Sequence, residues 1–327
     1  VTLRIKAPEA KKVTVVGDCI ERGHGELTQQ DGVWSYTTAQ LPAELYSYRF
    51  YVDGVETQDA GNIERSRDVR SFMSTFIVSK EEGDKGWLYQ NHNVEHGDVA
   101  HVWYDSPQLG LKRRMSIYTP PEYDKGKAYP VLYLLHGAGG DEEAWLTLGR
   151  TAQILDNLIE KGLAKPMIVV MPNGNPNQQA AQTFGLPTTE YDWRDPANRN
   201  LYVQSLVEEI VPFIEKNYRT VAKKSHRAIA GLSMGGGHTI AATGMYPDKF
   251  DYICPLSMGA QRTPELDAQL QGIKKGVLEM ADDEWDFTIA TDETSVFKMT
   301  RAFGNIMKKQ KYGRIINIAS MYGLVGN

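Results

Sequence analysis

The residues best suited to chemistry form a glycine-flanked motif, GLSMG, at positions 231–235. It follows the apolar run RAIA at 227–230 and precedes a helix-compatible segment that ends near Met245. Glycines two positions before and after a serine permit a sharp strand-to-helix turn, which lifts the hydroxyl above a sheet. The pattern predicts that Ser233 is the nucleophile of an acyl-transfer reaction. The alternative is a glycine-rich corner with an incidental serine.

A second motif, HGAGG at 136–140, ends an apolar run and predicts an oxyanion hole. A backbone N–H of Gly137 or Ala138 would join that of Met234, whose helix start directs free N–H groups at the nucleophile. An ordinary glycine-rich loop is the alternative. The two motifs occur in the order that such a fold demands, which favours the oxyanion hole. We expect His136 to support the loop rather than to transfer protons.

The general base is the part of this machinery that the sequence does not supply. On a strand–elbow–helix scaffold the chain order is nucleophile, acid, histidine. Only His238 follows Ser233, five residues along the same helix, and a separation of about 1.4 turns puts the two on different faces. His92, His96 and His101 precede the central strands and are poor candidates. We therefore expect no catalytic histidine, and for His238 a packing or surface role.

Composition excludes several classes of function. The 327 residues carry a net charge of −5 and no long basic run, which argues against nucleic acid as a partner. No run approaches the length of a membrane-spanning helix, so no membrane partner is expected. Cys19 and Cys254 are far apart and predict neither a disulfide nor a metal site. The start at Val1 is expected of a recombinant product or of a mature form without its signal peptide. We expect no metal and no cofactor.

The elements that must position these residues fall into two domains. Residues 1–78 contain β-branched and aromatic runs bounded by turn residues, which predict a small immunoglobulin-like β-sandwich with strands at 13–16, 33–37 and 46–52. The polar segment 79–100 is expected to be a linker. Trp34, Tyr36, Tyr46, Tyr48 and Phe50 would form either a sugar-stacking platform or core, and core is favoured because alternate residues face opposite ways.

Residues 101–277 alternate between strand and helix patterns, which predicts an α/β domain with a mostly parallel sheet and helices on both faces. Pro212 should kink the second helix. Trp145 and Trp193 are expected on loops at the substrate-binding edge, to contact an aromatic acyl group or a sugar, or only their own domain. The expected elements are strands at 130–135, 167–171 and 252–257 and helices at 152–159 and 202–216.

The chain resembles a known family through segments that flank both motifs, namely YDSP at 104–107, RRMSIYTPP at 113–121, YPVLYLLHG at 129–137 and PMIVVMPNG at 166–174. Over about 95–277 it is similar to esterase D-like carbohydrate esterases, especially the feruloyl and acetyl-xylan esterases of carbohydrate esterase family one. The resemblance implies an α/β-hydrolase domain that hydrolyses ester-linked substituents of plant polysaccharides, in a secreted or periplasmic enzyme. The segment LYSYRFYVDG at 45–54 resembles the glycogen-binding-like sandwich that often precedes such domains.

The tail, residues 278–327, departs from that pattern and resembles a fragment of a short-chain dehydrogenase/reductase, with Ser320 at the position of that family's serine. The dinucleotide-binding loop is absent, so we expect no NAD(P) binding. We interpret the tail as a fusion that replaced the end of the esterase domain; a plain helix and strand is the alternative. Asp282 and Asp283 are weak candidates for the catalytic acid.

Three functions follow, given from the most expected to the least expected. The first is a serine carboxyl-ester hydrolase acting on plant cell-wall polysaccharide or its esterified oligosaccharides, impaired because its histidine is missing. The second is a carbohydrate-binding protein on a catalytically dead hydrolase scaffold. The third, remote, is an NAD(P)-dependent dehydrogenase.

Overall fold

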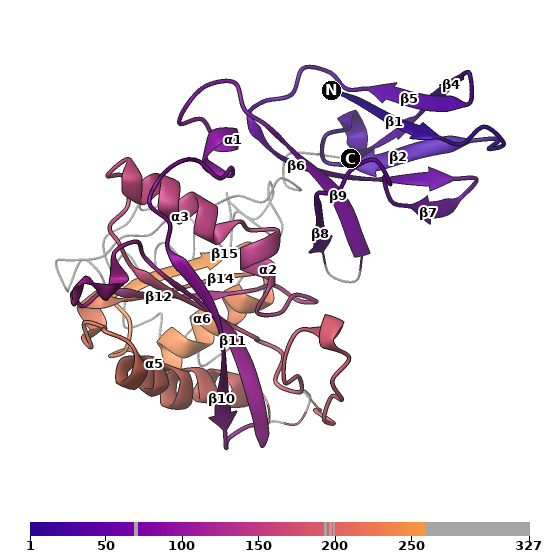
Figure 1. Cartoon of the computed structure of the whole chain (residues 1–327). Helices are drawn as coiled ribbons and strands as arrows, with labels where there is room; N and C mark the ends of the chain where they lie inside the picture. Colours follow the sequence, from indigo (N-terminus) through magenta and orange to yellow (C-terminus); the bar gives the residue numbers. More distant parts are fainter. Residues whose placement is uncertain (69–70, 193–194, 196–197, 199, 259–327) are drawn as a thin grey trace, which may run out of the picture. The chain divides into compact units, whose positions relative to one another are not determined.

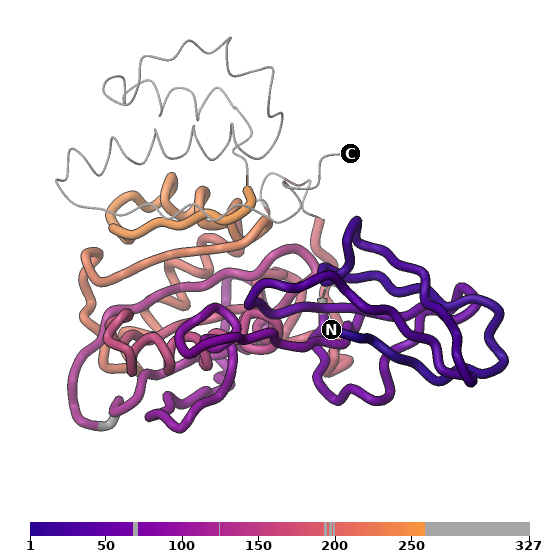
Figure 2. The backbone as a smooth tube through the Cα atoms, turned by 90° about the horizontal axis from the view of Figure 1, so that it is seen from above, coloured from indigo at the N-terminus to yellow at the C-terminus, as the bar shows by residue number. Residues whose placement is uncertain are grey.

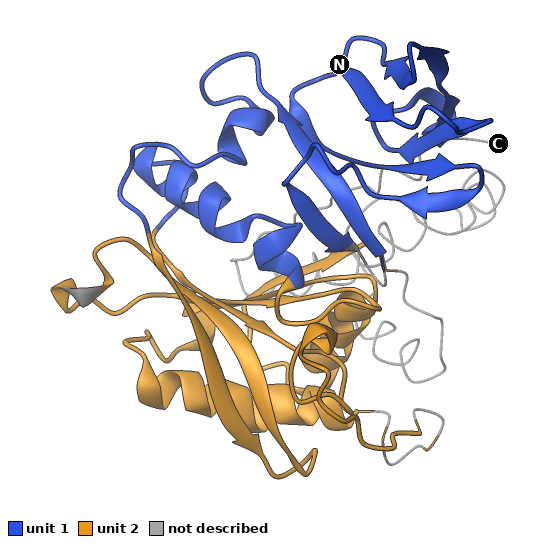
Figure 3. Cartoon of the chain, turned by 45° about the vertical axis from the view of Figure 1, so that its right-hand side comes forward, with its two compact units in different colours: residues 1–96, 144–165 blue, residues 97–143, 166–327 orange. Residues whose placement is uncertain are grey.

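The computed structural model of the chain describes residues 1–258 except 69–70, 193–194, 196–197 and 199. Figure 2 traces the backbone, with the residues outside this description in grey. The chain divides into two compact units. The first comprises Val1–His96 and Ala144–Lys165, and the second Gly97–Glu143 and Pro166–Asn327 (Figure 3). Trp193, Asp282, Asp283 and the tail 278–327, for which the sequence predicts roles, lie outside the described residues.

In its described residues the first unit contains two antiparallel sheets, one of order β1-β5-β4 and one of order β3-β2-β6-β9-β8, with β7 paired to β6 (Figure 1). The expected strands are present as β2, β5 and β6. The bounds are β1 Thr2–Lys6, β2 Val13–Gly17, η1 Glu21–Gly23, β3 His24–Glu26, β4 Thr28–Gln30, β5 Val33–Thr37, β6 Glu44–Val52, β7 Val55–Thr57, β8 Arg65–Asp68 and β9 Ser71–Val78.

One hydrophobic cluster joins the two sheets. Leu3 and Trp34 come from the smaller sheet, and Val13, Val15 and Phe50 from the larger one. Burial of apolar area against a facing sheet is what stabilises such a pair. The all-β character of this part is therefore present in the structure, while its immunoglobulin-like class stays a prediction.

Four of the five aromatic residues that the sequence offered for sugar stacking belong to this core, and the sugar-stacking alternative is wrong for them. Tyr36 is partly buried and packs on the same cluster. A ring enclosed by its own domain has no face free for a ligand. The other four rings are almost inaccessible, with exposed fractions of 9% for Trp34, 6% for Tyr46, 3% for Tyr48 and 0% for Phe50.

The segment 79–100, expected to be a linker, is folded: as far as His96 it belongs to the first unit, and its last residues begin β10, Asp98–Ser106, of the second unit. Asp84 caps the short helix α1, Lys85–Leu88, through a 2.7 Å hydrogen bond from the Trp87 N–H to its carboxylate. The side chain of Asn157 on α3, Thr151–Glu160, donates to the carbonyls of Leu88 and Gln90. These contacts could not be predicted from the polar composition of the segment, because they are hydrogen bonds between side chains and the backbone.

The described sheet of the second unit has the order β10-β11-β13-β12-β14-β15. β10 and β11 run antiparallel to their neighbours, whereas β12, β13, β14 and β15 pair in parallel. This arrangement confirms the expected mostly parallel sheet. Its strands are β10 Asp98–Ser106, β11 Leu111–Thr119, β12 Val131–Leu135, β13 Ile168–Pro172, β14 Arg227–Leu232 and β15 Tyr252–Leu256.

The long expected helix consists of three consecutive pieces, α4 Leu201–Ser205, a π-helical turn η4 Leu206–Ile210 and α5 Val211–Asn217. Pro212 stands at the start of α5, and because proline has no N–H the regular hydrogen-bond ladder is interrupted there. A widened turn therefore precedes Pro212, and the kink itself stays a prediction. The other helices and helical turns not yet given are α2 Ala144–Thr147, α6 Met234–Met245, η2 Tyr123–Lys125, η3 Gln182–Phe184 and η5 Lys224–His226.

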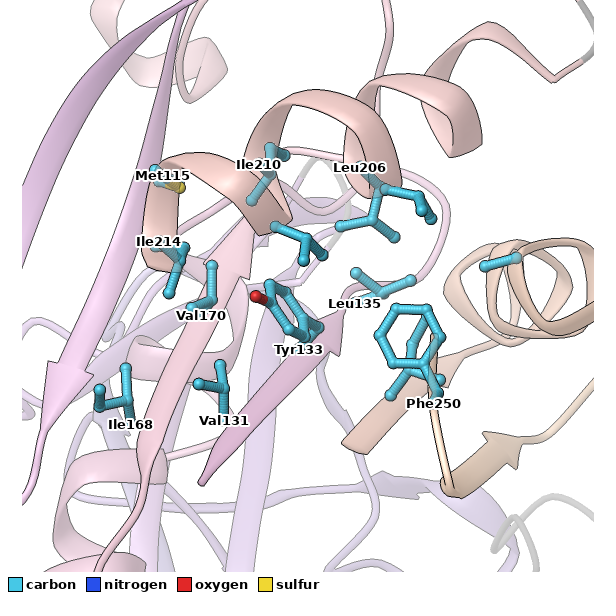
Figure 4. Close-up of a cluster of buried hydrophobic side chains, with 14 of the residues drawn as sticks. Met115, Val131, Tyr133, Leu135, Ile168, Val170, Leu206, Ile210, Ile214 and Phe250 are labelled. Atoms are coloured by element: carbon cyan, nitrogen blue, oxygen red, sulfur yellow. The ribbon is translucent and has the colours of Figure 1, made fainter. Parts of the chain in front are cut away.

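The helical pieces cover the sheet with the apolar stripe that the sequence predicts. Leu206, Ile210 and Ile214 are fully buried and share a cluster with Tyr133 of β12 and Phe250 (Figure 4). A packed layer of this kind holds the ends of β12, β13 and β14 in fixed positions. Those strand ends carry the candidate site.

Candidate active site

Ser233 occupies a strained turn between β14 and α6. Its backbone has φ 51° and ψ −111°, a conformation that residues other than glycine rarely adopt. The residue is exposed. A Cβ added to Gly231 would lie 2.2 Å from the carbonyl oxygen of Gly235, and one added to Gly235 would lie 2.6 Å from the Leu135 oxygen. Both glycines are therefore required by close backbone approach, as expected of a nucleophile elbow.

The loop after β12 lies beside this turn. A Cβ on Gly137 would stand 3.6 Å from the Cβ of Ser233 and 3.4 Å from the Leu232 oxygen. Met234 is the first residue of α6, where a helix leaves its backbone N–H groups without intrahelical partners. Ala138 is exposed in the same loop. The structure thus brings the predicted oxyanion residues Gly137 and Met234 to the serine.

His136 is fixed by hydrogen bonds at both ring nitrogens. The Gly174 N–H donates to Nε2 over 2.7 Å, so Nδ1 carries the proton and donates to the Gly137 oxygen over 2.8 Å. The imidazole is buried, at 2% exposure. A ring held in this way joins the loops after β12 and β13 and has no nitrogen left for Ser233, which fits the supporting role expected of it.

A buried carboxylate, Glu142, lies just after the loop 136–140 and ties it to neighbouring segments. Glu142 accepts hydrogen bonds from Arg114 Nε at 2.7 Å, Asn173 Nδ2 at 3.0 Å and the Ala181 N–H at 2.8 Å. Burial raises the pKa of the Glu142 carboxyl, and the hydrogen bonds and the Arg114 charge oppose that rise. Asn175 Nδ2 also donates to the Gly140 oxygen over 2.8 Å. These bonds make the loop rigid before any ligand binds.

Arg113 secures the neighbouring loop without a carboxylate. Its side chain is fully buried and donates to the carbonyl oxygens of Asn173, Asn175 and Pro176. Neither arginine was predicted from the sequence to have a role at the site. The available signal was the pair of arginines inside an otherwise apolar strand pattern, because a buried charge in such a place requires fixed partners.

The seven histidines of the sequence all lie among the described residues, and none is hydrogen-bonded to the Ser233 hydroxyl there. His101 pairs with Glu143 through Nε2 at 2.8 Å, and His96 pairs through Nδ1 with Asp156 at 2.9 Å. The ring of His92 stacks on Trp87. Each of these imidazoles therefore has a structural contact of its own.

His238 packs against an aromatic ring inside the second unit. Its ring centroid lies 4.6 Å from that of Tyr202, and its Nδ1 is buried without a hydrogen-bond partner in the described part of the chain. Burial, and secondarily the nearby His136, lowers the pKa of His238 to about 4. It is neutral at pH 7 and fits the packing role expected of it.

Trp145 does not lie on a loop as expected. It belongs to the helix α2 in the first unit, its carbonyl accepts a 2.7 Å hydrogen bond from the Thr151 hydroxyl, and its indole nitrogen is buried. Its predicted contact with substrate stays a prediction. Among the described residues no cluster of histidine, cysteine and acidic side chains is suited to a metal ion, and no helix there has the length and apolar character needed to cross a membrane.

Comparison with known proteins gives one family match. The sequence model of the family described as "Putative esterase" matches residues 106–310, which extends past the boundary at 277 expected from the sequence. An endo-1,4-beta-xylanase/feruloyl esterase of Xylanibacter ruminicola is 34% identical over 271 residues, which cover 80% of this chain and 35% of that protein. The chain thus spans little more than a third of the curated relative. The chain also matches two esterases of Mycobacterium tuberculosis, and the match covers 38% of the length of each of those proteins.

Two further similarities concern the fold and a second class of enzyme. The enterobactin esterase FES of Shigella flexneri, solved in the presence of 2,3-di-hydroxy-N-benzoyl-serine, has a TM-score of 0.61 at 14% identity and covers 98% of this chain and 87% of its own. This likeness concerns the fold alone. A 3-oxoacyl-[acyl-carrier-protein] reductase of Synechocystis is 30% identical over 115 residues, 34% of this chain and 47% of that protein.

Proposed function

The chain belongs to this esterase family, and from that premise we propose that it is built to act as a serine carboxyl-ester hydrolase on feruloyl or acetyl esters of plant polysaccharide such as xylan. The observation that carries the proposal is the strained Ser233, exposed beside the backbone of Gly137. Such strain persists only where the surrounding structure enforces it, and it gathers at functional sites.

In the proposed reaction Ser233 Oγ attacks the ester carbonyl carbon. The negative charge that develops on the carbonyl oxygen rests on the N–H groups of Met234 and of Gly137 or Ala138. The C–O bond to the sugar then breaks, the sugar hydroxyl leaves with a proton, and water hydrolyses the acyl-serine. The hydrogen bonds of His136 and Glu142 hold the loop that carries the oxyanion donors, so the loop does not have to rearrange when the charge develops.

The substrate class is supported by the relative from Xylanibacter ruminicola, whose name joins xylanase and feruloyl esterase activities. A polysaccharide of the plant cell wall is reached by secreted or periplasmic enzymes, and we place this chain among them as part of the proposal. Trp145 and Trp193 remain candidates for substrate contact.

The turnover of this chain should be low because its proton acceptor is missing. We propose that the tail 278–327, which the esterase model covers only as far as residue 310, replaced the segment that carries the histidine in the family. The similarity to the reductase, over 115 residues of the chain, supports a foreign segment. Asp282 and Asp283 are then substitutes for the acid at most. A site that lacks one triad member keeps only about 10³–10⁴-fold catalysis over water. Without the dinucleotide-binding loop we expect no NAD(P) binding, and titration of cofactor fluorescence should stay flat.

Hydrolysis of methyl ferulate and p-nitrophenyl acetate tests the proposal. The full chain should hydrolyse both slowly, and its intact mass should show an acyl adduct on Ser233 that Ser233→Ala cannot form, because the nucleophile is lost. Rates typical of an enzyme that vanish in Ser233→Ala would contradict the missing base and retain the esterase. Slow hydrolysis with no acyl adduct on Ser233 of the full chain would contradict the role of Ser233 itself.

A further inference from the structure

A second candidate surface lies at the edge of the sheet in the second unit. β10 is the edge strand, and its Trp103 is 47% exposed. Trp103 stands directly opposite Arg114 of β11 in the antiparallel register. Side chains of directly opposed residues share one face of a sheet and contact each other. The indole therefore lies next to the side chain of Arg114.

A second exposed ring contacts the same arginine. The guanidinium carbon of Arg114 is 4.2 Å from the centroid of the Phe184 ring, and Phe184 is 54% exposed. Arg114 itself is buried, held by Glu142 and by Glu143. One accessible ring, Phe184, thus packs on an immobilised guanidinium group, and a second, Trp103, stands opposite Arg114 on the same face of the sheet.

Fixed polar groups border the rings. His101 lies two residues before Trp103 on the same strand and hence on the same face. Its Nε2 is 2.8 Å from the Glu143 oxygen that also accepts from Arg114. The side chains of His101 and Glu143 remain 38% and 24% exposed. We call Trp103, Phe184, His101, Glu143 and Arg114 together the ring surface.

We propose that the ring surface binds the sugar backbone of a neutral polysaccharide, the xylan chain whose esters the elbow would cleave. This proposal rests on the proposed function for its choice of polysaccharide. A pyranose ring presents C–H groups on its faces and hydroxyl groups around its rim. Exposed aromatic rings bury the C–H faces, and polar groups already held in place bond the hydroxyls at little entropic cost.

The charges of the ring surface favour a neutral ligand. The positive charge of Arg114 is paired with two carboxylates, those of the buried Glu142 and of Glu143, so no positive charge is left for an anionic partner. The one carboxylate in excess is engaged by His101. A protein partner would require a larger continuous apolar area than two rings separated by an ion pair provide. Four of the five aromatic residues that the sequence offered for sugar binding, by contrast, are core.

Binding to xylohexaose by calorimetry, and retardation in native gels that contain xylan, test the ring surface. All variants are made in the full chain with Ser233→Ala, so that no ester is cleaved. Trp103→Ala and Phe184→Ala should each weaken binding about tenfold, because truncation of a buried aromatic anchor has an effect of that order. Trp103→Tyr should retain most of the affinity. Phe72→Ala is the matched control, since Phe72 is a 43% exposed aromatic residue of the first unit.

The outcomes separate the ring surface from the proposed function. Unchanged sugar binding in the double variant Trp103→Ala/Phe184→Ala, or no binding by the parent chain, overturns the ring surface whatever the esterase assays give. Concentration-dependent dimers that Trp103→Ala abolishes would overturn it in favour of a second copy of the chain. Sugar binding that depends on both rings, in a chain that hydrolyses no ester, would support the ring surface and contradict the hydrolase.

Discussion

At the scale of single residues, the environment of each histidine decides what it can do. His136 has both nitrogens engaged, and His238 is packed on Tyr202 with a buried nitrogen that makes no hydrogen bond in the described structure. A base must be accessible to the proton it removes and titrate near the working pH. Neither imidazole meets both conditions.

His238 yields a prediction on pH dependence. Its pKa falls from 6.5 to about 4 on folding, so between these pH values the unfolded chain binds a proton that the folded chain does not. Stability should therefore decrease as the pH is lowered from 6.5 toward 4. His238→Phe keeps the ring contact and removes both the titration and the unpaired nitrogen, so it should be at least as stable at pH 7 and lose less stability in acid. Denaturant unfolding at pH 7, 5.5 and 4.5 measures this difference.

The same variant checks the assignment of roles. His238→Phe should retain the slow ester hydrolysis of the parent chain, with His238→Gln as the polar control. If both variants lose a hydrolysis that depends on Ser233, His238 is the base and its packing role is secondary. An acid loss of stability equal in parent and variant would contradict the depressed pKa.

At the scale of elements, the turn that joins β14 to α6 holds Ser233 in a strained backbone conformation, which exposes its hydroxyl. A left-handed φ costs a residue with a Cβ about 1–3 kcal/mol, and glycine escapes that cost at some loss of entropy. Ser233→Gly should thus raise the free energy of unfolding by about 1 kcal/mol while it removes the nucleophile. Ser233→Ala is the matched control, because alanine keeps the strain. Equal stability of the glycine and alanine variants would show that the turn is not strained.

Elements with one dominant local signal were predictable, and those that depend on distant partners were not. The strands at 131–135 and 168–172 follow from continuous apolar runs, and the elbow follows from its glycines. The short helix α1 depends on Asp84 and on contacts with α3, which polar composition conceals. In the same way Trp34 and Trp103 look alike in the sequence, and only the fold decides that the first is core and the second exposed.

At the scale of the molecule, the candidate site is assembled within one unit. Ser233, Gly137, His136 and Glu142 all belong to the second unit, and none of the residues in its main hydrophobic cluster is shared with that of the first. Each unit therefore has a core of its own. The arrangement agrees with the sequence in having an all-β part before an α/β part, but α2 and α3 belong to the first unit, which no local pattern predicts.

Because each unit has its own core, a destabilising substitution in one core should affect amide hydrogen exchange mainly in that unit. Phe50 is fully buried in the first cluster, and Phe50→Ala should cost that unit about 3–5 kcal/mol. Amide hydrogen exchange should then accelerate in β2, β6 and β9, while β12, β13 and β14 keep their protection and the geometry around Ser233 is preserved. Ile210→Ala is the converse variant, since Ile210 is fully buried in the second cluster and should release β12 and β14 first. Exchange that accelerates equally in both units for either variant would mean that the two cores unfold as one cooperative body, and the site would then depend on the first unit after all.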